Sequence, residues 1–376
     1  MSNRVLMVAT VPSMIGQFNM NNIQLLLDLD YQVDVAADFK DTSIWPRERA
    51  KQLVAELKGK GVKCIQVDFS RQPLNIKHHI GSYRRILNLI RARNYSFIHT
   101  HTPIASAIVR LCANKTGTKV IYTAHGFHFY EGAPLKNWIV YYPIERWLSR
   151  YTDVLITINK EDYRRAKKHF NARKMVYIPG VGVDISKYIP NKEGRKKIRK
   201  ELGVSDDQIV LLSVGELNEN KNHISVIMAI QGLNYVYVIA GIGENEEVLK
   251  KAAIDNDVDL RLIGYRTDIS DVYRAADIYV LPSLREGLNV SLMEAMAAGL
   301  PVVCGNIRGN VDLVDENSGA TFDPHDSSEM SYSIKTVIAS DRKKLGANNK
   351  NRIKKCDCNI INNSMKDIYT QVNNDG

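Results

Sequence analysis

The segment that decides the fold is Ala276-Asp-Ile-Tyr-Val-Leu-Pro282-Ser-Leu-Arg-Glu286-Gly-Leu-Asn-Val-Ser-Leu-Met-Glu294-Ala-Met-Ala-Ala-Gly299-Leu-Pro301-Val-Val303. Its apolar run at 278–281 predicts a short buried strand, which Pro282 ends because proline has no N–H to donate. Asn289 is placed to cap a following helix, and Gly299 to end that helix in the left-handed conformation. Strand, loop, helix and strand in this order form the repeating unit of a parallel α/β sheet.

Two carboxylates occupy different parts of this unit. Glu286 lies on the loop at the end of the strand, and Glu294 lies about one turn into the helix. The start of such a helix presents unpaired N–H groups and a positive dipole end, which suits a diphosphate. A carboxylate accepts paired hydroxyls, so Glu294 is a candidate for a ribose diol and Glu286 for a sugar. On spacing alone, two solvated charges beside an ordinary helix explain the pattern equally well.

The same alternation of short apolar runs and helical patterns extends along the whole chain, which predicts an α/β protein with parallel sheets. Many of the runs lack a polar face, as expected of strands that are buried on both sides. The predicted strands are residues 5–9, 32–36, 64–67, 97–99, 120–123, 154–158 and 176–178, followed by 209–214, 235–240, 260–263, 278–281, 302–304 and 320–322.

The two sets of strands are separated near Pro179-Gly180-Val-Gly182, a segment whose composition fits an interdomain linker. We therefore predict two facing Rossmann-like domains at residues 1–180 and 181–376, with a last helix that is able to cross back to the first domain. Ligands of open parallel sheets bind beyond the carboxyl ends of the strands. This rule predicts an active site in the cleft between the two domains.

Composition sets further bounds. The chain has 376 residues, of which 44% are apolar and 24% charged, and a core of this size suits two globular domains. The sequence has no apolar stretch long enough to span a bilayer, and its amino terminus runs directly into a strand pattern rather than a signal peptide. Five scattered cysteines indicate reduced thiols in a cytoplasmic protein.

The charge is distributed unevenly. Residues 1–180 carry 27 Lys and Arg against 13 Asp and Glu, whereas residues 181–376 carry 24 against 28. Such asymmetry indicates that the first half meets an anionic partner. A helix over 83–91 combines an apolar stripe at 86, 87 and 90 with flanking Arg84, Arg85 and Arg91. This helix is either a solvated element packed on the sheet or a contact with anionic lipid headgroups.

The decisive segment resembles the retaining family 4 glycosyltransferases, which have the GT-B fold. The resemblance rests on Glu286-Gly and Glu294-Ala-x-Ala-x-Gly-x-Pro-Val and covers nearly the whole chain. The Ala124-His-Gly-Phe-His128 and Val214-Gly-Glu-Leu-Asn218 segments look more closely like the branch that builds bacterial capsule and exopolysaccharide. The resemblance implies that Glu286 contacts the donor sugar and that Glu294 binds the ribose. It also implies that the backbone of Gly287, Leu288 and Asn289 approaches the sugar and the phosphates.

The resemblance implies further donor contacts. Lys221 matches a lysine that binds the pyrophosphate, but Glu216 stands where the family usually has an arginine. His125 matches a histidine that touches the donor sugar near the reacting carbon. Gly16, in a predicted loop over 10–19, matches a glycine whose backbone approaches phosphate and acceptor. His99-Thr-His101 has a metal-like spacing, but no third ligand is evident, and packing in the cleft at the end of the strand is favoured.

These implications give a retaining, metal-independent transferase without a cofactor. It would move a sugar, by family default from a UDP donor, to a lipid-linked glycan on the inner face of the cell membrane. The protein would be cytoplasmic and peripheral, and would hold the anionic membrane surface through its basic first domain. A sugar-nucleotide epimerase with the same architecture is the rival enzyme. A basic nucleic-acid-binding protein is the rival of another class, although the chain has no recognisable nucleic-acid module.

Overall fold

The computed structural model describes residues 3–374 and divides the chain into two compact units. Unit 1 comprises the chain up to Ile178 together with the residues from Ile361 on, and unit 2 comprises Pro179–Ile360. The boundary therefore falls at the Pro179-Gly180 segment that the sequence singled out. The residues from Ile361 on belong to unit 1 rather than to the second domain, which is the return of the last helix that the prediction provided for. That the two halves face one another across a cleft stays a prediction.

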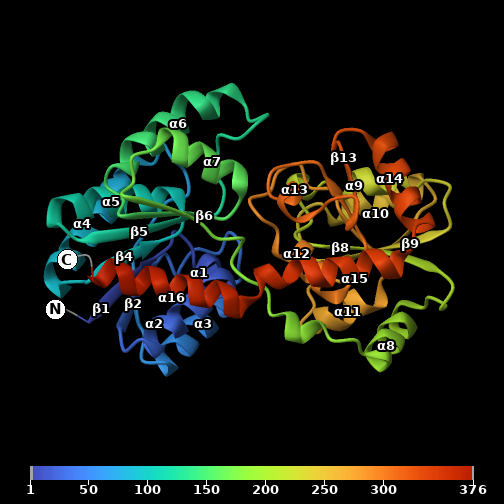
Figure 1. Ribbon diagram of the computed structural model, residues 1–376, viewed down its shortest axis with the longest axis horizontal. Coiled ribbons are helices and arrows are strands. Elements are labelled where there is room, and N and C mark those ends of the chain that lie inside the picture. The colour runs from blue at the N-terminus through green and yellow to red at the C-terminus, as the bar shows by residue number, and fades with distance from the viewer. Residues whose placement is uncertain (1–2, 375–376) are drawn as a thin grey trace. The chain divides into compact units, whose positions relative to one another are not determined.

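Unit 1 is a parallel sheet of seven strands in the order β3-β2-β1-β4-β5-β6-β7, with helices on both faces (Figure 1). Its strands are β1 Arg4–Val8, β2 Gln32–Ala37, β3 Lys63–Gln66, β4 Phe97–Thr100, β5 Lys119–Ala124, β6 Val154–Thr157 and β7 Lys174–Tyr177. Its helices are α1 Pro12–Phe18, α2 Met20–Asp28, α3 Arg47–Gly59, α4 Ile76–Arg93, α5 Pro103–Thr116, α6 Leu135–Ser149, α7 Lys160–His169 and most of α16 Cys358–Asn374.

Unit 2 is a parallel sheet of six strands in the order β10-β9-β8-β11-β12-β13. Its strands are β8 Ile209–Val214, β9 Tyr235–Ala240, β10 Asp259–Leu262, β11 Ile278–Leu281, β12 Val302–Gly305 and β13 Gly319–Phe322. Its helices are α8 Lys192–Leu202, α9 His223–Ala229, α10 Glu246–Asp255, α11 Ile269–Ala275, α12 Val290–Ala298, α13 Asn310–Leu313, α14 Ser327–Ala339 and α15 Arg342–Ile353. Short 3-10 helices cover Ile185–Tyr188, Glu219–Lys221 and Lys354–Cys356.

The predicted strands are all present, with ends that move by no more than two residues. The five cysteines are free thiols, as predicted. The predicted loop over 10–19 is wrong, because helix α1 occupies most of it. Pro12 at the first helical turn fixes a helical φ, and Ile15 is fully buried, so both local geometry and core packing favour a helix there.

Both sheets reverse their strand order at one place, between β1 and β4 in unit 1 and between β8 and β11 in unit 2. At such a switch point the loops that leave the two neighbouring strands run in opposite directions and open a crevice at the carboxyl edge. In unit 2 these loops are 215–222 after β8 and 282–289 after β11. The decisive segment of the sequence therefore lies at the place in this sheet where ligands usually bind.

Candidate functional site

The loop and helix after β11 have the geometry that the sequence predicts. Asn289 caps helix α12, and its side chain accepts a hydrogen bond of 3.1 Å from the N–H of Leu292. Gly299 ends the helix with a φ of +79°, a conformation that costs glycine little. Leu288 is buried, so its side chain serves the core and its backbone is the part that can meet a ligand. Glu286 precedes the helix on the loop, and Glu294 lies within it.

Lys221 and Glu286, predicted separately, form an ion pair with 2.7 Å between Nζ and Oε1. Both side chains are largely shielded, with 17% and 14% of their surface exposed. The two loops that carry them are also joined through Asn220, whose carbonyl accepts from the N–H of Leu284 at 2.9 Å and whose side chain donates to the Arg285 carbonyl at 3.2 Å. The switch point of unit 2 thus brings together a cation and a carboxylate that lie 65 residues apart.

Glu294 is hydrogen-bonded by two tyrosines that no sequence motif indicated. The hydroxyl of Tyr273 donates to Oε2 at 3.0 Å, and Tyr188 makes a second hydrogen bond to the carboxylate. Burial raises the pKa of Glu294 above its usual value, and these two hydrogen bonds oppose the rise only in part. The two tyrosine hydroxyls therefore fix the position of the Glu294 carboxylate, and a carboxylate held in this way suits recognition of a pair of hydroxyls.

Glycines let the loops around the Lys221–Glu286 ion pair approach one another closely. A Cβ on Gly309 would stand 2.1 Å from the carbonyl oxygen of Gly287, and one on Gly241 would stand 1.7 Å from that of Gly215. Arg308, just before Gly309, donates from Nε to the Glu286 carbonyl at 3.1 Å. Sequence reasoning missed Arg308, Tyr188 and Tyr273, because each acts from another segment and none belongs to a recognisable motif.

Glu216 has an exposed side chain on the loop after β8, in the position where the family usually has an arginine. Lys221 is held differently. Its backbone N–H donates to the capping Oδ1 of Asn218 at 3.0 Å, and its side chain reaches back so that a Cβ on Gly215 would stand 3.2 Å from its Cε. Lys221 is therefore the cation that this loop directs toward the start of α12.

In unit 1, the predicted His125 belongs to a group of three histidines. Its Nε2 lies 3.3 Å from Nδ1 of His101, and the His101 ring packs against that of His99 with centroids 4.0 Å apart. His99 is buried between the Tyr369 hydroxyl and the Thr123 hydroxyl, each 2.9 Å from one ring nitrogen. Burial lowers the pKa of His99 to about 3 and that of His125 to about 4.

The histidine group is therefore neutral at physiological pH. His99 and His101 are buried in the interior of unit 1, and they connect His125 to helix α16 through Tyr369; their packing in a cleft stays a prediction. A neutral His125 is able to accept or donate one hydrogen bond but does not supply a positive charge. A neutral imidazole suits a hydrogen bond to a hydroxyl better than contact with a phosphate charge.

Gly16 lies inside helix α1 rather than on a loop. A Cβ at this position would stand 2.4 Å from the ring of Trp45, so the glycine permits close packing between the helix and that ring. This packing is a structural reason for the residue. Its predicted approach to phosphate and acceptor stays a prediction.

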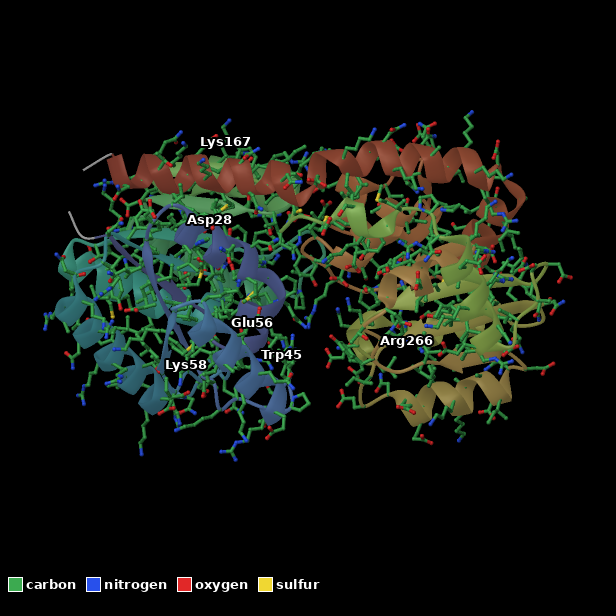
Figure 2. All side chains as sticks on the ribbon, turned by 90° about the horizontal axis from the view of Figure 1, so that it is seen from below. Asp28, Trp45, Glu56, Lys58, Lys167 and Arg266 are labelled. Atoms are coloured by element: carbon green, nitrogen blue, oxygen red, sulfur yellow. The ribbon has the colours of Figure 1, made fainter. Side chains whose placement is uncertain are left out.

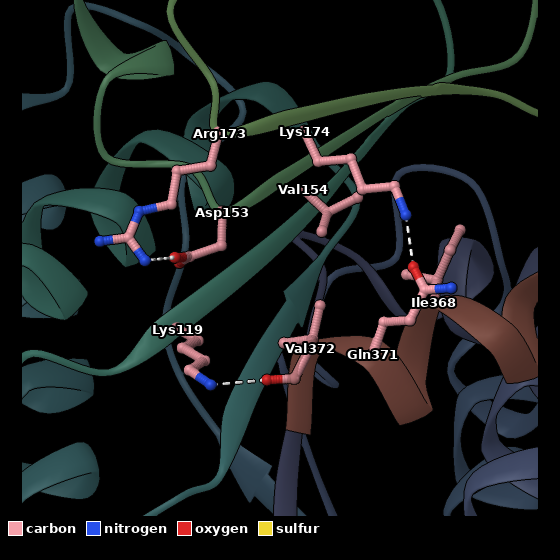
Figure 3. Close-up of a pocket in the computed structure, with 8 residues that line it drawn as sticks. All are labelled: Lys119, Asp153, Val154, Arg173, Lys174, Ile368, Gln371 and Val372. Carbon is pink, nitrogen blue, oxygen red and sulfur yellow. Dashed lines mark hydrogen bonds and ion pairs between the residues drawn. The ribbon is translucent and has the colours of Figure 1, made fainter. Parts of the chain in front are cut away.

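A shallow cavity in unit 1 lies away from these residues. It is lined by side chains from the starts of β5, β6 and β7 and from α16, including Lys119, Arg173 and Gln371 (Figure 3). Lys119 donates to the Val372 carbonyl and Arg173 pairs with Asp153, so its polar groups already have partners. The cavity opens at the amino edge of the strands, opposite to the edge where ligands of parallel sheets bind.

Two family descriptions match the chain in succession. Residues 17–187 match Glycosyltransferase Family 4, and residues 194–352 match Glycosyl transferases group 1. A Bacillus subtilis protein named glycosyltransferase EpsD is 31% identical over 90% of this chain and 88% of its own length. The UDP-Gal:alpha-D-GlcNAc-diphosphoundecaprenol alpha-1,3-galactosyltransferase of Escherichia coli is also 31% identical, over 76% of this chain and 77% of its own length.

Solved structures agree on the fold. HepE of Anabaena, in complex with UDP, superposes with a TM-score of 0.78 at 17% identity and covers 99% of this chain and 100% of that one. WaaG, a glycosyltransferase involved in lipopolysaccharide biosynthesis, superposes with a TM-score of 0.72 at 17% identity, over 97% and 99% of the two chains. Since its two halves match these families in turn and 90% of it aligns at 31% identity, the chain belongs to the family 4 glycosyltransferases of the GT-B fold, in the exopolysaccharide branch.

Proposed function

We propose that this glycosyltransferase moves a sugar from a UDP donor to a lipid-linked glycan, with retention at the anomeric carbon and without a metal ion. The Escherichia coli relative is named for a UDP-galactose donor and a diphosphoundecaprenol-linked acceptor, and HepE is described with UDP bound. These names support the classes of donor and acceptor. In this proposal the product serves capsule or exopolysaccharide synthesis at the inner face of the cell membrane.

The observation that carries the proposal is the Lys221–Glu286 ion pair beside the start of α12. An ammonium on a flexible side chain suits a diphosphate, and the backbone after Glu286 supplies N–H donors at a positive helix end. When the Lys221 ammonium binds the diphosphate, it releases the Glu286 carboxylate, which then accepts a hydrogen bond from a hydroxyl of the transferred sugar. Glu294, between Tyr188 and Tyr273, then holds the ribose diol.

The proposed chemistry is an attack on the same face of the sugar. The acceptor oxygen forms a bond to the anomeric carbon, the bond from that carbon to the diphosphate oxygen breaks, and the acceptor proton passes to the departing diphosphate. The protein contributes position and charge stabilisation, mainly through Lys221 and the amides of Gly287, Leu288 and Asn289. His125 is proposed to hydrogen-bond the sugar as a neutral imidazole. No metal is needed to balance these steps, and we propose that turnover persists in a chelator.

A panel of nucleotide sugars tests the proposal by thermal stabilisation and by donor hydrolysis, each with and without EDTA. We expect one UDP-sugar to stabilise the wild-type protein and Glu294→Ala to abolish that effect. NMR of the product should show the anomeric configuration of the donor. Unchanged donor affinity in Glu294→Ala would show that Glu294 does not bind the donor. A rearranged nucleotide sugar formed without acceptor would instead identify an epimerase.

The acceptor class predicts a place at a membrane surface. Within residues 3–374, no helix is both long and apolar enough to cross a bilayer. We propose that the protein is peripheral and that it uses its basic half to meet anionic lipid.

A further inference from the structure

Helix α6 in unit 1 is apolar on both of its faces. Its inner face carries Trp138 and Tyr142, which pack against the aromatic cluster of Phe127, Phe129 and Phe170. Its outer face carries exposed apolar side chains, whose exposed fractions run from 43% for Trp147 to 73% for Leu135. The exposed apolar residues of the helix are Leu135, Ile139, Val140, Pro143, Ile144 and Trp147. A helix on the surface of a soluble protein normally presents polar residues to water, so this face fits contact with a partner.

The exposed charges on α6 itself have one sign. Lys136 and Arg146 lie on α6 itself, and Arg150 follows its last turn. Glu145, the acidic residue of α6, is buried and pairs with Arg110 at 2.9 Å, so it is turned away from the outer face. An exposed acid, Glu131, lies outside the helix in the preceding loop. The outer face of α6 is therefore apolar and cationic.

Helix α7 extends this cationic character. It contacts α6 through Arg165, whose guanidinium stacks on Trp138 at 4.8 Å, and the two helices lie side by side in Figure 1. Its exposed residues include Arg164, Lys167 and Lys168, and Lys167 lies at the outer edge of the view in Figure 2. Glu161 pairs with Arg165 at 2.8 Å, and Asp162 is buried. We name the exposed residues of α6 and α7 together the α6–α7 face.

We infer that the α6–α7 face is the surface by which this protein lies on an anionic lipid bilayer. Aliphatic side chains on one helix face enter the boundary between headgroups and acyl chains, while neighbouring lysines and arginines contact the lipid phosphates. A tryptophan at the edge of such a face suits the same boundary. A protein partner fits less well, because the cores of protein interfaces are depleted of lysine. The inference rests on the proposed function in that a lipid-linked acceptor is held in such a bilayer.

The proposed membrane contact differs from the lipid contact that the sequence left open for α4. The apolar stripe of α4, Ile86, Leu87 and Ile90, is buried in the core of unit 1, so it does not reach lipid. Arg84, Arg85 and Arg91 remain exposed on that helix. At these positions α4 adds positive charge but no apolar face, and its exposed apolar residues, Ile76 and Ile80, are fewer than those of α6.

Co-sedimentation of the full-length protein with vesicles tests the inference. We expect binding to vesicles of phosphatidylglycerol and phosphatidylcholine in equal parts, and little binding to phosphatidylcholine alone. The double variant Ile139→Ser, Ile144→Ser should reduce the bound fraction at least about tenfold, because two aliphatic side chains that would be buried in the bilayer have been removed. Lys167→Gln with Lys168→Gln should weaken binding to the anionic vesicles and reduce its dependence on salt.

The matched control is Ile254→Ser on α10 of unit 2, where an isoleucine that is 80% exposed undergoes the same change. It should leave vesicle binding unaltered. Unchanged binding in the Ile139→Ser, Ile144→Ser variant, or equal loss in the control, would overturn the inference. So would a wild-type dimer that this variant converts to a monomer, since the face would then be an interface between copies. Donor hydrolysis is measured in parallel: its absence with vesicle binding intact counts against the proposed function alone.

Discussion

At the scale of single residues, Glu294 combines burial with a role that needs charge. Its pKa is raised by burial, while Tyr188 and Tyr273 hydrogen-bond the ionised form. If the carboxylate accepts the ribose hydroxyls, donor affinity must fall as the pH drops through this raised pKa. The fall should begin above pH 4.5, the ordinary value for a glutamate. The ionised carboxylate is also an unfavourable group for the folded state, because its pKa is higher there than in the unfolded chain.

We predict that Glu294→Gln lowers donor affinity by at least about tenfold at neutral pH, since hydrogen bonds to a charged acceptor contribute roughly 1.5–3 kcal/mol. The remaining affinity should be flat with pH below neutrality. Thermal stability without donor should be kept or raised, because a buried carboxylate has been replaced by a neutral group of the same shape. Calorimetric titration with the UDP-sugar over a pH series measures the donor affinity and its dependence on pH. A variant with wild-type acid dependence would show that another group titrates.

The histidines of unit 1 make a second prediction at this scale. The pKa values of about 3 for His99 and about 4 for His125 lie below the ordinary 6.5, so the folded state binds fewer protons than the unfolded chain. The stability that this difference contributes is complete above pH 6.5 and is lost as the pH falls toward the folded values. Each such histidine adds a slope of about 1.4 kcal/mol per pH unit to the unfolding free energy in that window.

We expect His101→Gln to reduce this slope, and His78→Gln, at an exposed position on α4, to leave it unchanged. The three tryptophans, Trp45, Trp138 and Trp147, all lie in unit 1, so their fluorescence during urea unfolding reports on this unit. Equal slopes in the wild-type protein and His101→Gln would show that the histidine group protonates without cost.

At the scale of elements, the start of α12 depends on how closely neighbouring loops approach. Gly309 has a φ of +83°, and Gly232 has a similar φ of +73°. An alanine at Gly309 would meet the Gly287 carbonyl, whereas an alanine at Gly232 would meet nothing within 4 Å. Gly309 combines its φ with a ψ of −48°, outside the left-handed helical region, so the two variants are compared by donor affinity rather than by the size of their loss of stability.

We predict that both alanine variants lose stability, because φ is positive at each position, and that Gly309→Ala alone also loses donor affinity by about tenfold or more. Displacement of Gly287 would move the N–H groups proposed to hold the diphosphate, and small misplacements are costly there. Urea unfolding and donor titration of the two variants check this. Equal donor affinity in both would mean that the loop tolerates the shift.

At the scale of the whole molecule, the chain finishes in the unit where it began. Helix α16 contributes Ile361, Met365, Ile368, Tyr369 and Val372 to the core of unit 1. Tyr369 also stacks on Phe97 with centroids 5.6 Å apart and hydrogen-bonds His99. The fold of unit 1 therefore needs residues from both ends of the chain.

Truncation after Ile360 should leave unit 1 unfolded. Five buried apolar side chains contribute roughly 1.5–3 kcal/mol each, which together matches the whole stability of a typical domain. Tryptophan emission and limited proteolysis would show this, and Ile360→Ser, at an exposed position on the same helix, should change neither. A truncated protein with native tryptophan emission would contradict this account of α16.

The sequence alone determined the succession of strands and helices, the caps at Asn289 and Gly299, and the placing of Glu286 and Glu294. Each of these depends on residues within a turn or two of one another, where backbone preference and apolar periodicity act directly. Tertiary structure alone decided that Lys221 pairs with Glu286, that Tyr188 and Tyr273 hydrogen-bond Glu294, and which residues of α16 enter the core of unit 1. It also decided that residues 12–18 form a helix and that α6 exposes an apolar face. These features depend on strand order and on which surfaces pack together, and so on contacts between segments far apart in the chain.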